Sequence, residues 1–234
     1  LSTGVRLLPV ALSVGAGSVA GTQIALRAGT KLIVTAGLVA MAGFYGWVAA
    51  TTSATLSYGV ISVQMVVYGL GLGLTSAPAT ESIMGAISAA KAGVGSAVND
   101  STRLLGGTLG VAVIGSVYQS VYGSRLTATM PVHLPGSIGS IAHQSVGAAY
   151  AAAGKIAALG HPVLGQALLH ASTNAFLRGL TVASLVAGGV AAAGALLAVG
   201  FLPAQPAMPT ADQAETAVWA HEAEAQADPA SAIQ

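Results

Sequence analysis

The sequence predicts an all-α protein, a polytopic transmembrane helix bundle, and its composition supplies the first reason. Of the 234 residues, 54% are hydrophobic and only 6% are charged. A soluble domain carries about 25% charged residues, so this chain has too few charges to cover the surface of a soluble protein. The missing basic stripe also excludes a nucleic-acid binder, and the absence of cysteine excludes a disulfide scaffold.

Long uncharged stretches supply the second reason. No charged residue occurs in 32–80, 104–124 or 179–211, which are 49, 21 and 33 residues long. A helix that crosses a bilayer needs about 20 mostly apolar residues. Within lipid every backbone N–H and C=O must be paired inside the segment, which favours helices. The longest stretch can therefore hold two spans and a short turn.

Five spans are expected along residues 1–202. Arg27 and Lys31 lie in a tight turn between the first two spans. The third span is expected to end near Pro78, because proline cannot continue a helix without losing a hydrogen bond. A short connection with an amphipathic turn should follow at 79–95. The expected spans are 5–26, 32–52, 57–77, 96–122 and 174–202.

The connections between the spans predict the topology. Basic residues follow spans one and three, whereas the turn at 53–56 has no charge. Cytoplasmic connections are enriched in Lys and Arg, so the basic connections are placed inside. Residues 123–165, rich in Gly, Ser and Pro, are then expected to form a long polar extracytoplasmic loop. Tyr45 and Trp47 would lie at the outer interface, where aromatic rings gather.

The two ends of the chain differ from the apolar spans. Residues 203–234 contain five acidic and no basic residues, and this composition predicts a disordered acidic cytoplasmic tail. The chain begins with Leu1 rather than Met. We therefore expect the chain to be a fragment that starts inside a larger protein. The N-terminal half of that protein is then missing from this sequence.

Glycines are unusually frequent, with 31 in the chain. In membranes, small residues four apart let helix backbones approach closely. The glycines of the third span, from Gly69 to Gly73, together with Pro78 also suggest a flexible gate, and the two interpretations are compatible. The packing candidates are the pairs Gly17/Gly21, Gly69/Gly73 and Gly106/Gly110, with Gly107 inside the last run.

Asn99, Asp100 and Arg103 form an ionic group at the start of the fourth span. Asp100 and Arg103 are three residues apart and share a helix face. An Arg at the bilayer centre costs about 2.5–3.5 kcal/mol on the insertion scale. The group is interpreted either as a gating or substrate-path ion pair or as an interfacial anchor whose charges reach water. Asp100 is also a candidate proton carrier, although the neighbouring Arg103 favours its ionised form.

Other polar residues are weaker candidates. Gln64 in the third span could bind a ligand or a neighbouring helix, and the helix is favoured. The histidines of the loop lack the close spacing of a zinc site. No nucleophile–base arrangement indicates an active site. We therefore expect no enzyme activity, no metal and no cofactor.

Three stretches carry a family resemblance. They are APATESIMG at 77–85, AGVGSAVND at 92–100 and RLLGGTLGVAVIGS at 103–116. Together they resemble the C-terminal half of the major facilitator superfamily, in particular the fourteen-helix drug:proton antiporters of the EmrB/QacA type. The resemblance extends over residues 1–202 and implies that these are the last five helices.

The resemblance implies proton-coupled efflux of hydrophobic drugs or related small molecules by alternating access. The implied partners are the lipid bilayer, the missing N-terminal half, a hydrophobic substrate and the proton, with no nucleic acid. The implied location is a bacterial-type plasma membrane. The alternative is a non-transport membrane scaffold or anchor whose acidic tail binds a partner.

Overall fold

The computed structural model describes residues 2–85, 87–88, 91–130, 136–202 and 219. These residues form seven α-helices and no strand, which confirms the predicted all-α class. The expected acidic tail lies outside the described residues, except for Trp219.

Five of the described helices are long and apolar enough to span a membrane. They are α1 (Ser2–Ala28), α2 (Thr30–Thr51), α3 (Tyr58–Gly85), α4 (Ala92–Thr129) and α7 (Pro162–Phe201). Two shorter helices, α5 (Gly136–Gln144) and α6 (Val146–Ala158), lie between α4 and α7. The five predicted spans are thus confirmed as helices, although their ends differ.

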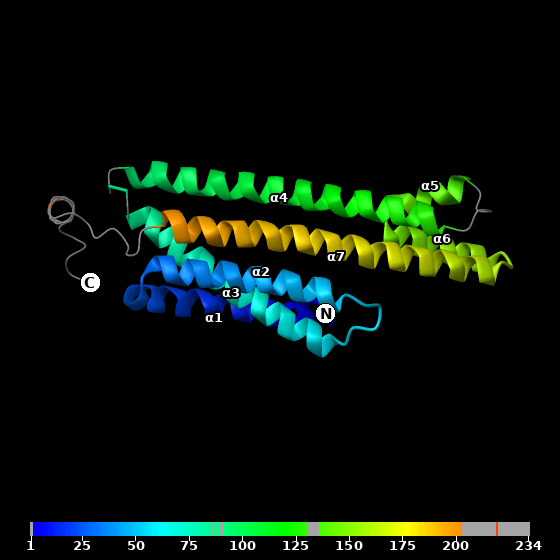
Figure 1. Cartoon of the computed structure of the whole chain (residues 1–234), viewed down its shortest axis with the longest axis horizontal. Helices are drawn as coiled ribbons and strands as arrows, with labels where there is room; N and C mark the ends of the chain where they lie inside the picture. The colour runs from blue at the N-terminus through cyan, green and yellow to red at the C-terminus, as the bar shows by residue number, and fades with distance from the viewer. Residues whose placement is uncertain (1, 86, 89–90, 131–135, 203–218, 220–234) are drawn as a thin grey trace, which may run out of the picture.

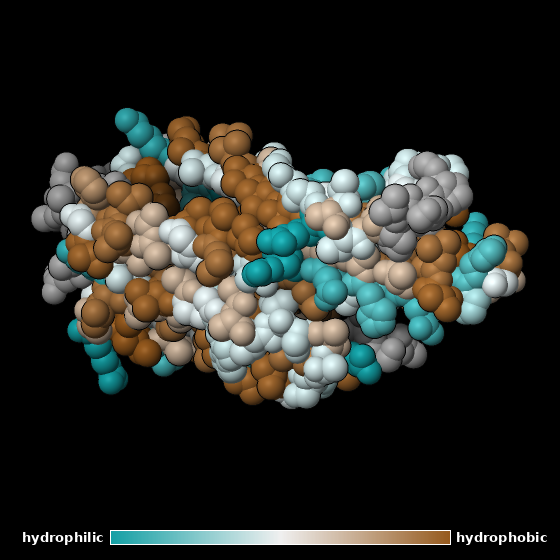
Figure 2. Space-filling view, turned by 45° about the vertical axis from the view of Figure 1, so that its right-hand side comes forward, coloured by the Kyte–Doolittle hydropathy of each residue, from teal (hydrophilic) through white to brown (hydrophobic). Residues whose placement is uncertain are grey.

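The long helices run side by side in an order that differs from the chain order (Figure 1). α1 packs against α3, α2 packs against α3 and α7, and α4 packs mainly against α7. α4 therefore lies at the edge of the bundle, and none of its most apolar window is buried. Broad apolar areas lie in the left and central parts of the visible face of the molecule (Figure 2), as expected of a surface in contact with lipid.

Glycines allow α3 to pack closely against two neighbours. A Cβ atom built on Gly73 would lie 2.5 Å from the carbonyl oxygen of Val14 in α1. One built on Gly71 would lie 2.9 Å from the carbonyl oxygen of Gly37 in α2. These distances leave no room for a side chain, so the backbones themselves are in contact.

α3 continues through Pro78 to Gly85, so the predicted end near Pro78 is wrong. Proline inside a helix costs about 3 kcal/mol through the lost hydrogen bond and a steric clash. Here Pro78 is completely buried against α1, and its Cγ lies 3.3 Å from where a Cβ of Gly21 would be. Packing between α1 and α3 supports the continued helix. The expected connection at 79–95 is correspondingly shortened.

The predicted polar loop at 123–165 is also wrong, because its described residues are largely helical. α4 has 38 residues and α7 has 40, so they are about 57 and 60 Å long at a rise of 1.5 Å per residue. The hydrocarbon core of a bilayer is about 30 Å thick. Both helices are therefore longer than the hydrocarbon core is thick, and we expect the ends that pack with α5 and α6 to lie beyond it. We call the assembly of 118–130, α5, α6 and 162–176 the distal cap.

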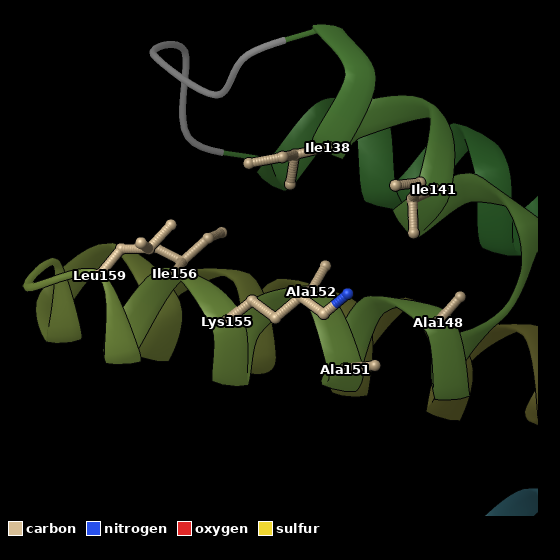
Figure 3. Close-up of a pocket in the computed structure, with 8 residues that line it drawn as sticks. All are labelled: Ile138, Ile141, Ala148, Ala151, Ala152, Lys155, Ile156 and Leu159. Carbon is tan, nitrogen blue, oxygen red and sulfur yellow. The ribbon is translucent and has the colours of Figure 1, made fainter.

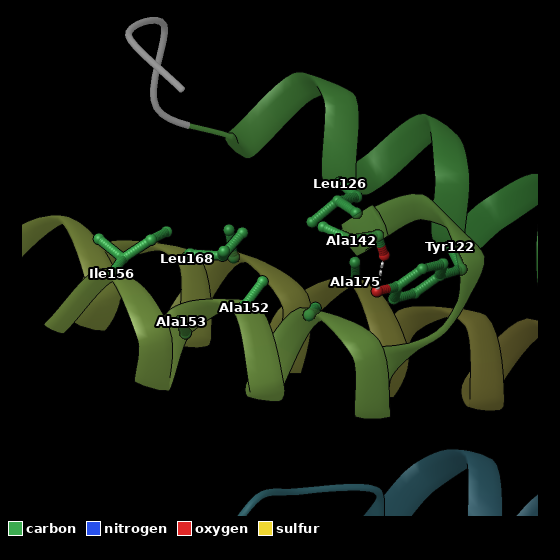
Figure 4. Close-up of a cluster of buried hydrophobic side chains, with 10 residues drawn as sticks. Tyr122, Leu126, Ala142, Ala152, Ala153, Ile156, Leu168 and Ala175 are labelled. Atoms are coloured by element: carbon green, nitrogen blue, oxygen red, sulfur yellow. Dashed lines mark hydrogen bonds between the residues drawn. The ribbon is translucent and has the colours of Figure 1, made fainter. Parts of the chain in front are cut away.

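A hydrophobic core holds the distal cap together (Figure 4). Tyr122, Leu126 and Leu168 are fully buried there, among alanines of α5, α6 and α7. The hydroxyl of Tyr122 donates a 2.9 Å hydrogen bond to the carbonyl oxygen of Ala142. Outside the membrane, water drives apolar side chains together. The cap therefore has an apolar core of its own.

Candidate functional site

The ionic group lies near the start of α4. Arg103 is eleven residues after Ala92, about 17 Å along the helix axis at 1.5 Å per residue. The side chains of Asp100 and Arg103 are exposed, and Asn99 is half-buried. Within the described part of the chain, no hydrogen bond or ion pair joins Asp100 to Arg103. The two charges therefore remain available to other groups.

An apolar cleft of about 540 Å³ opens between α2, α4 and α7. Tyr45 contributes the only hydroxyl group of its lining. The wall consists of Leu38, Met41 and Tyr45 from α2, Gly106, Leu109, Gly110, Val113 and Ile114 from α4, and Ala187, Val190, Ala191 and Gly194 from α7. Its size and apolar character are typical of a site for a hydrophobic small molecule.

The glycines of α4 help to keep this cleft open. A Cβ atom on Gly106, Gly107 or Gly110 would meet nothing within 4 Å. In the described structure these glycines thus have no packing partner, unlike Gly69 and Gly73, whose positions are filled by α1. Gly106 and Gly110 line the cleft instead.

The ionic group and the cleft share one face of α4. Asn99, Arg103, Gly106 and Gly110 follow spacings of four, three and four residues, which keep side chains on one side of a helix. Asp100 lies three residues before Arg103 but six before Gly106, which places it about 120° around the helix from that glycine. Arg103 therefore lies about one turn before the cleft on the helix surface that lines it, and Asp100 lies beside Arg103.

Tyr45, the aromatic residue of the cleft wall, belongs to a cluster of three rings. The ring centroids of Phe44 and Tyr45 are 5.0 Å apart, and those of Tyr45 and Tyr68 are 6.1 Å apart. Tyr45, which was expected at the outer membrane interface, lines the cleft. An aromatic ring at this position can attract a cation over its face. The cluster could not be predicted from the sequence, because its rings come from α2 and α3.

Gln64 lies near the start of α3 and is only 5% exposed. Its Nε2 donates a 2.9 Å hydrogen bond to Oγ1 of Thr51, the last residue of α2. Gln64 is thus hydrogen-bonded to a neighbouring helix, which was the favoured interpretation. It does not line the apolar cleft.

A second inter-helix hydrogen bond lies at the other end of α3. Oγ1 of Thr22 in α1 donates to Oε1 of Glu81 at 3.0 Å. Among the described residues, no three His, Asp or Glu side chains come together as a metal-binding group. The polar features of the bundle are therefore the α4 ionic group and hydrogen bonds between helices.

These features define a class of protein: a membrane helix bundle with an apolar cleft between spans and a charged group at its edge. No family model matches the chain. Three known proteins are similar to the chain in sequence. It is 28% identical over 203 residues to the multidrug efflux pump LfrA of Mycolicibacterium smegmatis, covering 86% of this chain and 39% of LfrA.

The other two relatives are also resistance or transport proteins. The chain is 31% identical over 199 residues to the methyl viologen resistance protein SmvA of Salmonella typhimurium, covering 84% of this chain and 38% of SmvA. It is 29% identical over 149 residues to the multidrug transporter protein MdtP of Bacillus subtilis, covering 62% of this chain and 27% of MdtP.

The chain is thus a homologue of bacterial multidrug efflux pumps and transporters, in agreement with its resemblance to the major facilitator superfamily. With its five apolar helices it belongs to an integral, multi-pass plasma-membrane protein. It spans less than two fifths of the length of LfrA and SmvA. The relatives are named as transporters rather than enzymes, which fits the expected non-enzymatic role.

Proposed function

We propose that this chain is part of a secondary transporter that exports hydrophobic small molecules, drugs among them, by proton-coupled alternating access. The observation that carries the proposal is the apolar cleft of about 540 Å³ that continues, along one face of α4, from Arg103. Alternating access needs two helical units that move about a shared site. The remainder of the protein would supply the second unit.

The cleft suits a substrate that is mostly apolar. Burying apolar surface contributes about 25 cal/mol per Å², and a lining of leucine, valine, methionine and glycine allows this without leaving many polar groups unpaired. The ring of Tyr45 would add an attraction for substrates with a positive charge. We therefore expect the substrates to be hydrophobic, either neutral or positively charged.

Asp100 and Arg103 support a role in gating or along the substrate path. A charge within a membrane helix is tolerated where it faces other helices or a water-filled cavity. Because Arg103 and Asn99 share the face of α4 that lines the cleft, we place them at its entrance, with Asp100 beside Arg103. In this proposal Asp100 is the group that carries the coupling proton.

The α1–α3 pair supports the movement. Gly69 and Gly73 bring the backbones of these helices into contact, so we propose that α1 and α3 move as one unit. Pro78 removes one backbone hydrogen bond from α3 and is the position where that unit would bend. Gln64 would hold the end of α3 to α2 through Thr51.

The test removes the charge of Arg103 in the full-length protein. Arg103→Ala is expected to lower efflux of a hydrophobic cationic dye from intact cells by more than tenfold, because the gate loses its charge, a change of over about 1.4 kcal/mol. Membrane insertion should be unchanged. Lys91→Ala, which removes a cation just before α4, is the matched control and should keep nearly full efflux.

The scaffold alternative predicts the opposite pattern. If the protein is a non-transport anchor, Arg103→Ala would be silent and deletion of residues 203–234 would abolish the cellular phenotype. Normal dye efflux by Arg103→Ala, at equal protein level in the membrane, would contradict the proposed gating role.

A further inference from the structure

A second apolar groove lies in the distal cap, between α5 and α6 (Figure 3). Its volume is about 340 Å³, within the range of about 300–1,000 Å³ that is typical of small-molecule sites. Isoleucines 138, 141 and 156 line it with Leu159 and small alanines of α6. The alanines leave a smooth floor along α6 on which an extended chain could lie.

One charged residue borders this groove. Lys155 is exposed, and its side chain lies along α6 with its amine beside Ala152 (Figure 3). It is the only charged residue in the lining. No Asp or Glu occurs anywhere between residues 101 and 202, so the chain of the cap contains no carboxylate to compete for the amine. The groove therefore combines apolar walls with one free positive charge.

The groove lies too far along the axis to be covered by bilayer chains. Phe176 of α7 is level with the turn between α2 and α3, because it shares a small cavity with Ser53. α7 continues for fourteen residues beyond Phe176, to Pro162, which is about 21 Å at 1.5 Å per residue. α6 packs along this extension, with Gly165 against Ala153. Apolar surface in such a place marks a binding site rather than a lipid contact.

We propose that the α5–α6 groove binds a medium-chain fatty acid, with the acyl chain along the alanine floor and the carboxylate on the Lys155 amine. The chain would gain from leaving water, and the carboxylate would form a charge-assisted hydrogen bond. Charge complementarity selects an anionic head group over a neutral or cationic one. The site is separate from the α2–α4–α7 cleft and does not depend on transport.

Photolabelling of the full-length protein tests this proposal. The protein is placed in zwitterionic lipid nanodiscs, exposed to dodecanoate that carries a terminal diazirine, irradiated and mapped by peptide mass spectrometry. Labels are expected within residues 136–159, and excess unlabelled dodecanoate should compete. Lys155→Gln should reduce labelling about fivefold, the loss expected of one exposed charge pair, and Lys155→Arg should retain it.

Matched controls separate the site from the cap as a whole. Ala151→Leu should reduce labelling by filling the groove floor, whereas Arg125→Gln removes a cap cation outside the groove lining and should not change it. Hydrogen exchange of α6 confirms that each variant is folded. The proposal is overturned if labels fall elsewhere, if dodecanol or dodecyltrimethylammonium competes equally well, or if only a protein partner occupies the groove. Dye efflux is measured in a separate assay. A loss of efflux would therefore not change the interpretation of the photolabelling result.

Discussion

Gly73→Ala is expected to lower the free energy of unfolding of the bundle by about 1–3 kcal/mol, the usual cost of overpacking. The added methyl would lie 2.5 Å from the carbonyl oxygen of Val14 and 2.6 Å from the amide nitrogen of Ser18. Both are backbone atoms and cannot rotate away. α1 and α3 must therefore separate, and this contact is the most extensive between helices in the structure.

Gly107→Ala is the matched control for this experiment. It makes the same chemical change inside a helix, but a Cβ there meets nothing within 4 Å. Alanine is the better helix former by about 1 kcal/mol, so Gly107→Ala should be neutral or slightly stabilising. Thermal unfolding of the two full-length variants in detergent, followed by tryptophan fluorescence, makes the comparison. Equal midpoints would contradict the close α1–α3 contact.

Leu168→Ala is expected to destabilise the distal cap by about 2–5 kcal/mol, the range for large-to-small core substitutions. Leu168 is 0% exposed and belongs to the core formed with Tyr122 and Ile156. Because this core lies between α6 and α7, its loss should open the cap locally while the membrane spans stay folded. Hydrogen exchange of the α6 amides measures this opening.

Leu159→Ala provides the comparison in the same cap. Leu159 is 77% exposed, so its truncation should change stability by less than about 0.5 kcal/mol. Faster exchange in α6 for Leu168→Ala but not for Leu159→Ala is the expected pattern. Unchanged exchange in both variants would mean that residues 123–165 behave as the irregular loop that their composition suggested.

The membrane spans could be predicted because hydrocarbon imposes a simple rule. A stretch without charge, about 20 residues or longer, must form a helix in lipid whatever its neighbours are. α2 illustrates this rule, because the span was expected at 32–52 and the helix extends over Thr30–Thr51. The ionic group could also be located from sequence, because Asp100 and Arg103 are neighbours on one helix.

The remaining features depend on contacts between distant segments. Pro78 stays inside α3 because Gly21, 57 residues earlier, leaves room for it. Ala149, Ala153 and Leu168 become a core only once α6 folds back on α7. The apolar cleft needs α2, α4 and α7 at once, and Tyr45 faces it only because of that arrangement.

Composition and charge spacing thus determined on their own the all-α class, the five helices that are long and apolar enough to cross a membrane, and where the charged group lies on α4. Tertiary structure alone decided which glycines touch another backbone, how α4 and α7 pack with α5 and α6, and what surrounds the two apolar cavities. The physical reason is that transfer into hydrocarbon depends on each segment by itself, whereas packing depends on the shapes of two surfaces that meet.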